Sequence, residues 1–184
     1  MTLSFFNPVA AVLLIPICSA ALLAALPGYR LTARLNVVAS LATFLAALSL
    51  LAIDRPPPGP YVLIDDLNIV FILLNTFIGF TTSAFSASYI AHELAIGRLT
   101  PRHLRFYHAM FQLMLFGMNL ALLANNIGLM WVAVELATLT TVMMVGLYRT
   151  AEALEAAWKY FILGSVGIAL ALLAPFWSTW RRGR

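Results

Sequence analysis

The sequence predicts an all-α integral membrane protein, a bundle of about six transmembrane helices forming a single domain over residues 1–184. Apolar residues make up 62% of the chain and charged residues 10%, whereas soluble proteins contain about 45–50% and 25%. Five stretches also have the length of about 20 mostly apolar residues that a bilayer crossing requires, and a sixth qualifies if Lys159 is tolerated within it. This composition leaves almost no room for a soluble domain.

The first half of the chain contains three of the expected helices. The first spans about 5–27, and no positively charged segment precedes it, which argues against a cleavable signal peptide. The next two span about 35–53 and 67–91. The proline-rich connector Asp54–Pro60 favours an extended polyproline II conformation, and Tyr61–Ile64 offers a short strand to a neighbouring loop.

The second half contains three more expected helices, at about 107–125, 127–148 and 151–179. The turn signal Asn125–Gly128 divides the long apolar run between the first two. Thr150 is a good N-cap for the last helix. Because the connection before it is short, the last two helices are expected to be antiparallel neighbours.

The basic residues predict the orientation, because loops on the cytoplasmic side carry an excess of Lys and Arg. The second loop is net acidic and the fourth is uncharged, whereas the first, third and fifth loops carry arginines: Arg30, Arg34, Arg98, Arg102, Arg105 and Arg149. We therefore expect a multi-pass protein of the cell inner membrane, with its N-terminus outside the cytoplasm. The net charge of +4 lies in short loops and the tail, so we expect no nucleic-acid partner.

The end of the chain breaks this pattern. Six crossings would place the C-terminus outside, yet Trp180–Arg184 is a basic segment typical of the cytoplasmic side. Pro175 also removes a backbone donor near the end of the last apolar stretch. Residues 174–184 are therefore expected to be an aberrant tail on a truncated or frame-shifted chain.

Glu135 is the single acidic residue in the long run from Phe106 to Tyr148. At about 1.5 Å per residue it lies roughly 20 Å from the Tyr148 end, near the middle of the membrane. A charge at the bilayer centre costs from about 3 to more than 10 kcal/mol, so such a residue normally faces protein or water and has a partner. Lys159 lies about 13 Å in from the same side on the next helix, within reach directly or through one water.

A Glu and a Lys on neighbouring helices form the minimal proton relay. Burial favours the neutral form of each group and the partner's charge favours the ionised form, so a nearby charge can move a proton through the pair. We therefore predict Glu135 and Lys159 as relay residues, with no cofactor and no metal site. The alternatives are a salt bridge that only joins two helices, and a Lys159 that snorkels to the cytoplasmic interface.

Other polar residues suggest packing. Gln112, Asn119 and Asn126 recur at a heptad spacing, which on one continuous helix places them on one face, either for interhelical hydrogen bonds or along a hydrated path. The alternative for Asn126 is a place in the turn that follows. Gly164 and Gly167 leave a smooth patch where another helix can approach closely. Three histidines match no standard metal site and are expected at the membrane interface: His92, His103 and His108.

Several segments resemble a known family, the antiporter-like proton-translocating subunits of respiratory complex I, Mrp-type antiporters and membrane-bound hydrogenases. The strongest similarity is to the hydrogenase-4 component F branch. It extends over the chain up to about Leu173 and is carried by these segments together: Asp65–Asn68, Ser86–Ile90, Leu123–Asn126, Met130–Thr141, Gly146–Thr150 and Ala156–Gly164.

This resemblance implies a fold of about fourteen helices with inverted repeats, of which this chain would be the N-terminal portion. It also implies that Glu135 and Lys159 help to move protons, or sodium, driven by redox chemistry in partner membrane subunits of a hydrogenase-4 or NADH-quinone oxidoreductase complex. The chain itself would be a non-catalytic subunit in the lipid bilayer. The family's Lys on a broken seventh helix has no counterpart here. Two alternatives stay open, a structural or assembly segment without transport and a small independent ion carrier.

Overall fold

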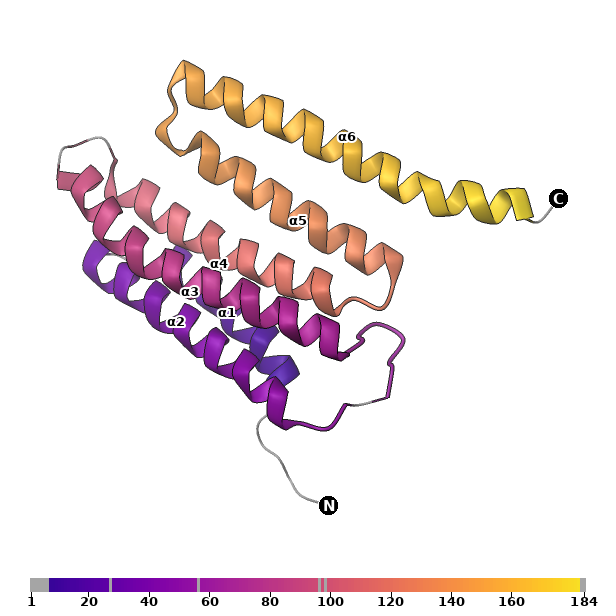
Figure 1. The fold of residues 1–184 in the computed structure, drawn as a ribbon. Coiled ribbons are helices and arrows are strands. Elements are labelled where there is room, and N and C mark those ends of the chain that lie inside the picture. Colours follow the sequence, from indigo (N-terminus) through magenta and orange to yellow (C-terminus); the bar gives the residue numbers. More distant parts are fainter. Residues whose placement is uncertain (1–6, 27, 56, 96, 98, 183–184) are drawn as a thin grey trace.

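The computed structural model describes residues 7–26, 28–55, 57–95, 97 and 99–182, which form long helices joined by short connections (Figure 1). Six helices in this described part are long and apolar enough to cross a membrane, which confirms the predicted fold class. The helices are α1 Pro8–Ala25, α2 Tyr29–Ser49, α3 Asp66–Ala95, α4 Pro101–Leu123, α5 Ile127–Val145 and α6 Ala151–Arg182, with short 3-10 turns η1 Leu50–Ala52 and η2 Gly146–Tyr148.

The helices run up and down, because each connection joins two helices at the same end of the bundle. Figure 1 shows the α3–α4 and α5–α6 connections at one end and the α2–α3 and α4–α5 connections at the other. Helix α4 packs against α1, α2, α3 and α5, whereas α6 lies along α5 at the edge. One broad side of α6 therefore faces away from the bundle.

Several helix starts have side-chain caps, whereas α2 begins after Gly28 without one. The Asn7 side chain accepts hydrogen bonds from the amides of Val9 and Ala10, and Asp65 Oδ1 accepts one from the Asn68 amide at 2.7 Å. Asn126 Oδ1 accepts from the Gly128 amide at 2.9 Å. Such caps satisfy amides that have no partner in the first turn. Asn126 is thus a cap at the start of α5, in agreement with the alternative that it lies in the turn and not on the polar face of the preceding helix.

Four helices extend further than the apolar stretches predicted, and one of them is α6, which ends at Arg182 instead of about 179. Helix α2 begins at Tyr29 instead of 35, α4 begins at Pro101 instead of 107, and α3 ends at Ala95 instead of 91. The additional turns contain charged residues such as Arg34 and Arg105, which an apolar span excludes. A helix continues beyond the hydrocarbon because long basic side chains keep their charge in water while their stems lie along the helix.

The connector after η1 makes the strand-like contact that the sequence suggested. Val62 and Ala124 form an isolated antiparallel bridge. The Leu63 amide donates to the Leu123 carbonyl and the Asn125 amide to the Tyr61 carbonyl, both at 2.9 Å. This single bridge ties the second loop to the fourth.

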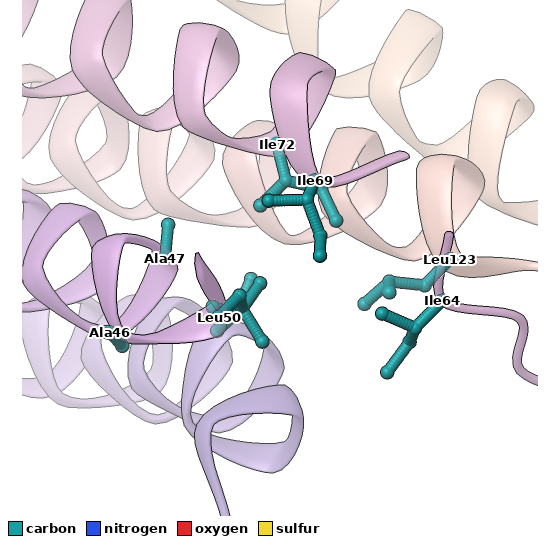
Figure 2. Close-up of a cluster of buried hydrophobic side chains, with 8 residues drawn as sticks. Ala46, Ala47, Leu50, Ile64, Ile69, Ile72 and Leu123 are labelled. Atoms are coloured by element: carbon teal, nitrogen blue, oxygen red, sulfur yellow. The ribbon is translucent and has the colours of Figure 1, made fainter. Parts of the chain in front are cut away.

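A cluster of buried apolar side chains fills this end of the bundle (Figure 2). Figure 2 shows Leu50 of η1 beside Ile69 and Ile72 of α3, with Ile64 of the connector near Leu123 of α4. Val12, Ala46 and Ala47 complete the cluster. It fixes the ends of α1 to α4 against one another.

Further along, the core between α2, α3 and α4 is polar. The Gln112 side chain donates to Asn36 Oδ1 and Ser40 Oγ, both at 2.9 Å. Asn119 accepts from Asn75 at 2.9 Å. The prediction of interhelical hydrogen bonds is therefore confirmed for Gln112 and Asn119. Buried polar side chains on these helices are Thr32, Asn36, Ser40, Thr43, Thr76, Ser83, Ser86, Glu93, His108, Gln112 and Asn119.

The three histidines do not share one environment. His92 is exposed at the end of α3, and His103 is half-buried in the first turns of α4. His108 is fully buried in α4, so the prediction of an interfacial position is wrong for this residue. The reason is that α4 starts six residues earlier than expected, which places His108 two turns inside the helix.

Candidate functional site

Glu135 lies near the middle of α5, between faces that contact α4 and α6. On the α4 side, a Cβ atom on Gly117 would lie 3.1 Å from the Ala133 carbonyl and the Ala137 amide. The two helix backbones are therefore in close contact at the level of Glu135. Within a membrane there is no hydrophobic effect between helices, and close van der Waals packing of small residues holds them together instead.

On the other side, α5 and α6 form an antiparallel pair in a regular register. A Cβ on Gly146 would meet Ala157 at 3.7 Å, and one on Gly164 would meet the Thr138 side chain at 3.1 Å. Gly164 thus serves the close approach that the sequence suggested, whereas a Cβ on Gly167 would meet nothing within 4 Å. Continuing this register places Ser165 opposite Glu135.

The Glu135 carboxylate has a hydrogen-bond donor on the neighbouring helix. The Ser165 hydroxyl donates to Glu135 Oε1 at 2.9 Å, and the Glu135 side chain is half-buried. Glu135 Oε2 is buried and has no hydrogen-bond partner among the described residues, and the same holds for Trp131 Nε1 one turn earlier. The site is therefore a carboxylate with one oxygen bound and one oxygen available to a further polar group.

Lys159 does not contact Glu135. Its ammonium forms an ion pair with Glu155 one turn earlier on α6, and the Lys159 side chain is 69% exposed. No ion pair or hydrogen bond links Lys159 with Glu135 in the described part of the chain. The structure thus separates the two predicted relay residues.

Helix geometry explains this separation. Ala157 is buried against Gly146 and marks the face of α6 that contacts α5. Lys159 is two residues further, a rotation of about 200°, so it points away from α5. It also lies about 9 Å along the helix axis from Ser165, the residue level with Glu135.

Sequence reasoning missed Ser165 and Glu93. Ser165 stands between the two glycines of the predicted patch, and extending the α5–α6 register from the short loop would have placed it opposite Glu135. Glu93 is a second acidic residue inside the bundle, 4% exposed near the end of α3. It was overlooked because the predicted helix ended at Ala91.

Comparison with known proteins gives consistent matches. The family model described as NADH:quinone oxidoreductase/Mrp antiporter, transmembrane, matches residues 124–184, which contain both Glu135 and Lys159. A hydrogenase-4 component F homolog of Methylacidiphilum infernorum is 60% identical over 167 residues, 91% of this chain and 35% of that protein. The chain therefore spans about a third of the length of this relative.

Two further relatives match shorter segments. NADH-quinone oxidoreductase subunit N 2 of Thermodesulfovibrio yellowstonii is 37% identical over 67 residues, 36% of this chain and 15% of that protein. F(420)H(2) dehydrogenase subunit N of Methanosarcina mazei is 38% identical over 71 residues, 38% of this chain and 14% of that protein. Together with the helical membrane fold, these matches show that the chain belongs to the antiporter-like membrane subunit family of NADH:quinone oxidoreductases, Mrp antiporters and hydrogenase-4 component F.

Proposed function

We propose that this chain takes part in proton translocation within a membrane redox complex of the hydrogenase-4 or NADH-quinone oxidoreductase type, with Glu135 as a relay carboxylate. The observation that carries the proposal is the half-buried carboxylate in the middle of a transmembrane helix. An ionisable side chain at that depth is costly and normally marks an ion or proton path. The relatives' names, which denote redox-complex subunits, support the coupling to redox chemistry.

Ser165 supports the proposed role chemically. A hydroxyl donates one hydrogen bond and accepts others, so it can pass a proton to or from a carboxylate. While the carboxylate is ionised, the 2.9 Å hydrogen bond from Ser165 replaces part of its lost hydration. Oε2, which has no hydrogen-bond partner among the described residues, is the oxygen that would receive a proton from a further polar group or deliver one to it.

We propose Lys159 as a second charge of the relay, reached through other groups instead of by direct contact with Glu135. Its ammonium and the Glu155 carboxylate form an ion pair with no net charge on the outer face of α6. A partner subunit that covers this face would bury the pair and couple it to charge in the complex. Protons are the proposed cargo, and sodium is the alternative ion.

A structural role is the competing function. The Ser165–Glu135 hydrogen bond and the close contact at Gly164 would then only hold α6 against α5. The position of Lys159 on the far face of α6 favours this alternative, because it removes the direct ion pair.

Replacing Glu135 by Gln in the membrane complex separates the two functions. Gln keeps the size and one hydrogen-bond acceptor but cannot ionise. We expect inverted vesicles to lose most of their proton uptake. The subunit content, measured on the same membranes, is expected to be unchanged. The matched control is Glu152→Gln, which removes an exposed carboxylate in the first turn of α6. Normal proton uptake in Glu135→Gln would leave only the structural role.

A further inference from the structure

A cavity of about 610 Å³ lies between α4, α5 and α6, at the end of the bundle where α4 and α6 begin. Its inner walls are apolar, formed by Phe106 of α4, Leu139 and Val142 of α5, and Leu154 and Phe161 of α6. This volume is within the range of about 300–1,000 Å³ that is usual for small-molecule sites. None of these residues takes part in the Glu135 site.

The rim of the cavity is positively charged. Arg102 and His103 from the first turn of α4 and Arg149 from the connection before α6 line it, and no Asp or Glu does so among the described residues. The N-termini of α4 and α6 are at this end, and each adds a partial positive charge. His103 Nδ1 is buried and has no hydrogen-bond partner in the described part of the chain. The rim therefore suits an anionic group that accepts hydrogen bonds.

We propose that this cavity binds an anionic phospholipid, with the phosphate between Arg102 and Arg149 and an acyl chain along the α5–α6 wall. A basic pocket between transmembrane helices on the predicted cytoplasmic side is suited to acidic lipid headgroups. Trp158, which also lines the cavity and is 62% exposed, has the amphipathic ring that favours the headgroup level. A free phosphate would satisfy the rim but leave the apolar walls uncovered.

The charge of the rim can be tested with two lipids that carry the same acyl chains. We expect native mass spectrometry of the full chain in detergent to show dioleoyl phosphatidylglycerol binding about tenfold tighter than dioleoyl phosphatidylcholine, since basic residues select acidic headgroups. Equal binding of both lipids would overturn the proposal. So would displacement of the bound phosphatidylglycerol by millimolar inorganic phosphate, which would assign the site to a soluble anion.

The arginines are tested by the double variant Arg102→Gln/Arg149→Gln. Since each basic residue near an anionic headgroup contributes about a factor of five, we expect about 25-fold weaker phosphatidylglycerol binding. The control is Arg30→Gln/Arg34→Gln, which removes the same charge from exposed positions at the start of α2, outside the cavity. Equal losses in the two double variants would show a general surface effect and contradict the site.

The apolar wall gives a second test that stands even if the arginine variant does not fold. Leu154→Trp fills the cavity without changing charge, and we expect several-fold weaker phosphatidylglycerol binding. Leu163→Trp is the control, because Leu163 is 77% exposed and does not line the cavity. Unchanged binding in Leu154→Trp would overturn the proposal. Binding that disappears when the chain is in its membrane complex would assign the cavity to a protein segment instead.

Discussion

The two carboxylate oxygens of Glu135, inside a membrane helix, differ in their hydrogen bonding. Its Oε1 receives the Ser165 hydroxyl, while its Oε2 is buried without a partner in the described part of the chain. Removing a buried polar atom from water without a hydrogen bond costs about 1–3 kcal/mol in proteins. One carboxylate oxygen is therefore satisfied, and the other has no partner among the described residues.

Ser165→Ala tests that hydrogen bond. Because the carboxylate would lose its donor, we expect the unfolding free energy in detergent to fall by about 1–2 kcal/mol and proton uptake by the complex to decrease. Ser165→Thr keeps a hydroxyl at the same position and is the matched control. If the Ala and Thr variants behave alike in both measurements, the hydroxyl is not the functional partner of Glu135.

Gln112 is a second residue whose side chain joins helices. It donates to Asn36 and Ser40 on α2, so Gln112→Leu would leave both groups without this donor. Interhelical hydrogen bonds in membrane proteins contribute about 0.6–1.7 kcal/mol each, and we expect a loss of about 1–2 kcal/mol. Equilibrium unfolding in mixed detergent micelles measures it. Met118→Leu, on the same helix but exposed, should change stability by less than about 0.5 kcal/mol.

At the scale of whole elements, the packing of α5 depends on small residues on both of its neighbours. Gly117 of α4 brings the α4 backbone against Ala133 and Ala137, and Gly164 of α6 approaches Thr138. These contacts fix the rotation of α5. They thereby decide that Glu135 points toward Ser165.

Gly117→Ala should separate α4 from α5. The new Cβ would lie 3.1 Å from backbone atoms of α5, which cannot move without shifting the helix. We expect a loss of about 1 kcal/mol or more in unfolding free energy, despite the better helix propensity of Ala. Gly167→Ala is the control, since its Cβ would meet nothing within 4 Å, and it should be neutral or stabilising. Equal stability of the two variants would contradict the close contact.

The same elements show what a sequence can predict in a membrane protein. The spans followed from local composition, because hydrocarbon thickness acts on each helix separately. The rotation of α6 depends on tertiary contacts such as Gly146 with Ala157, which no single segment encodes. The positions of Lys159 and Glu135 along their helices were therefore accessible from sequence, whereas the direction in which Lys159 points was not. The position of Ser165 opposite Glu135 could have been predicted by extending the α5–α6 register. The burial of Glu93 and His108 was not predicted, because the expected helices were too short at the ends that contain these residues.

At the scale of the molecule, charge and packing divide the bundle into two parts. Helices α2, α3 and α4 enclose most of the buried polar side chains, while α6 is largely exposed along its length. The predicted cytoplasmic end carries arginines and the lipid cavity, and the opposite end carries Asp54, Asp65 and Asp66. This asymmetry predicts a fixed orientation in the membrane.

Single-cysteine labelling tests the orientation directly. With Cys18 replaced by Ala, His92→Cys and Asp54→Cys each put one thiol at an exposed position near opposite ends of the bundle. Since arginine-rich loops stay in the cytoplasm, we expect a membrane-impermeant maleimide to label Asp54→Cys in intact cells or right-side-out vesicles, and His92→Cys only in inverted vesicles. The reverse pattern would place the N-terminus in the cytoplasm. It would also place the basic rim of the cavity at the outer leaflet. The negative surface potential of the cytoplasmic leaflet, which attracts basic residues, would then not act on these arginines.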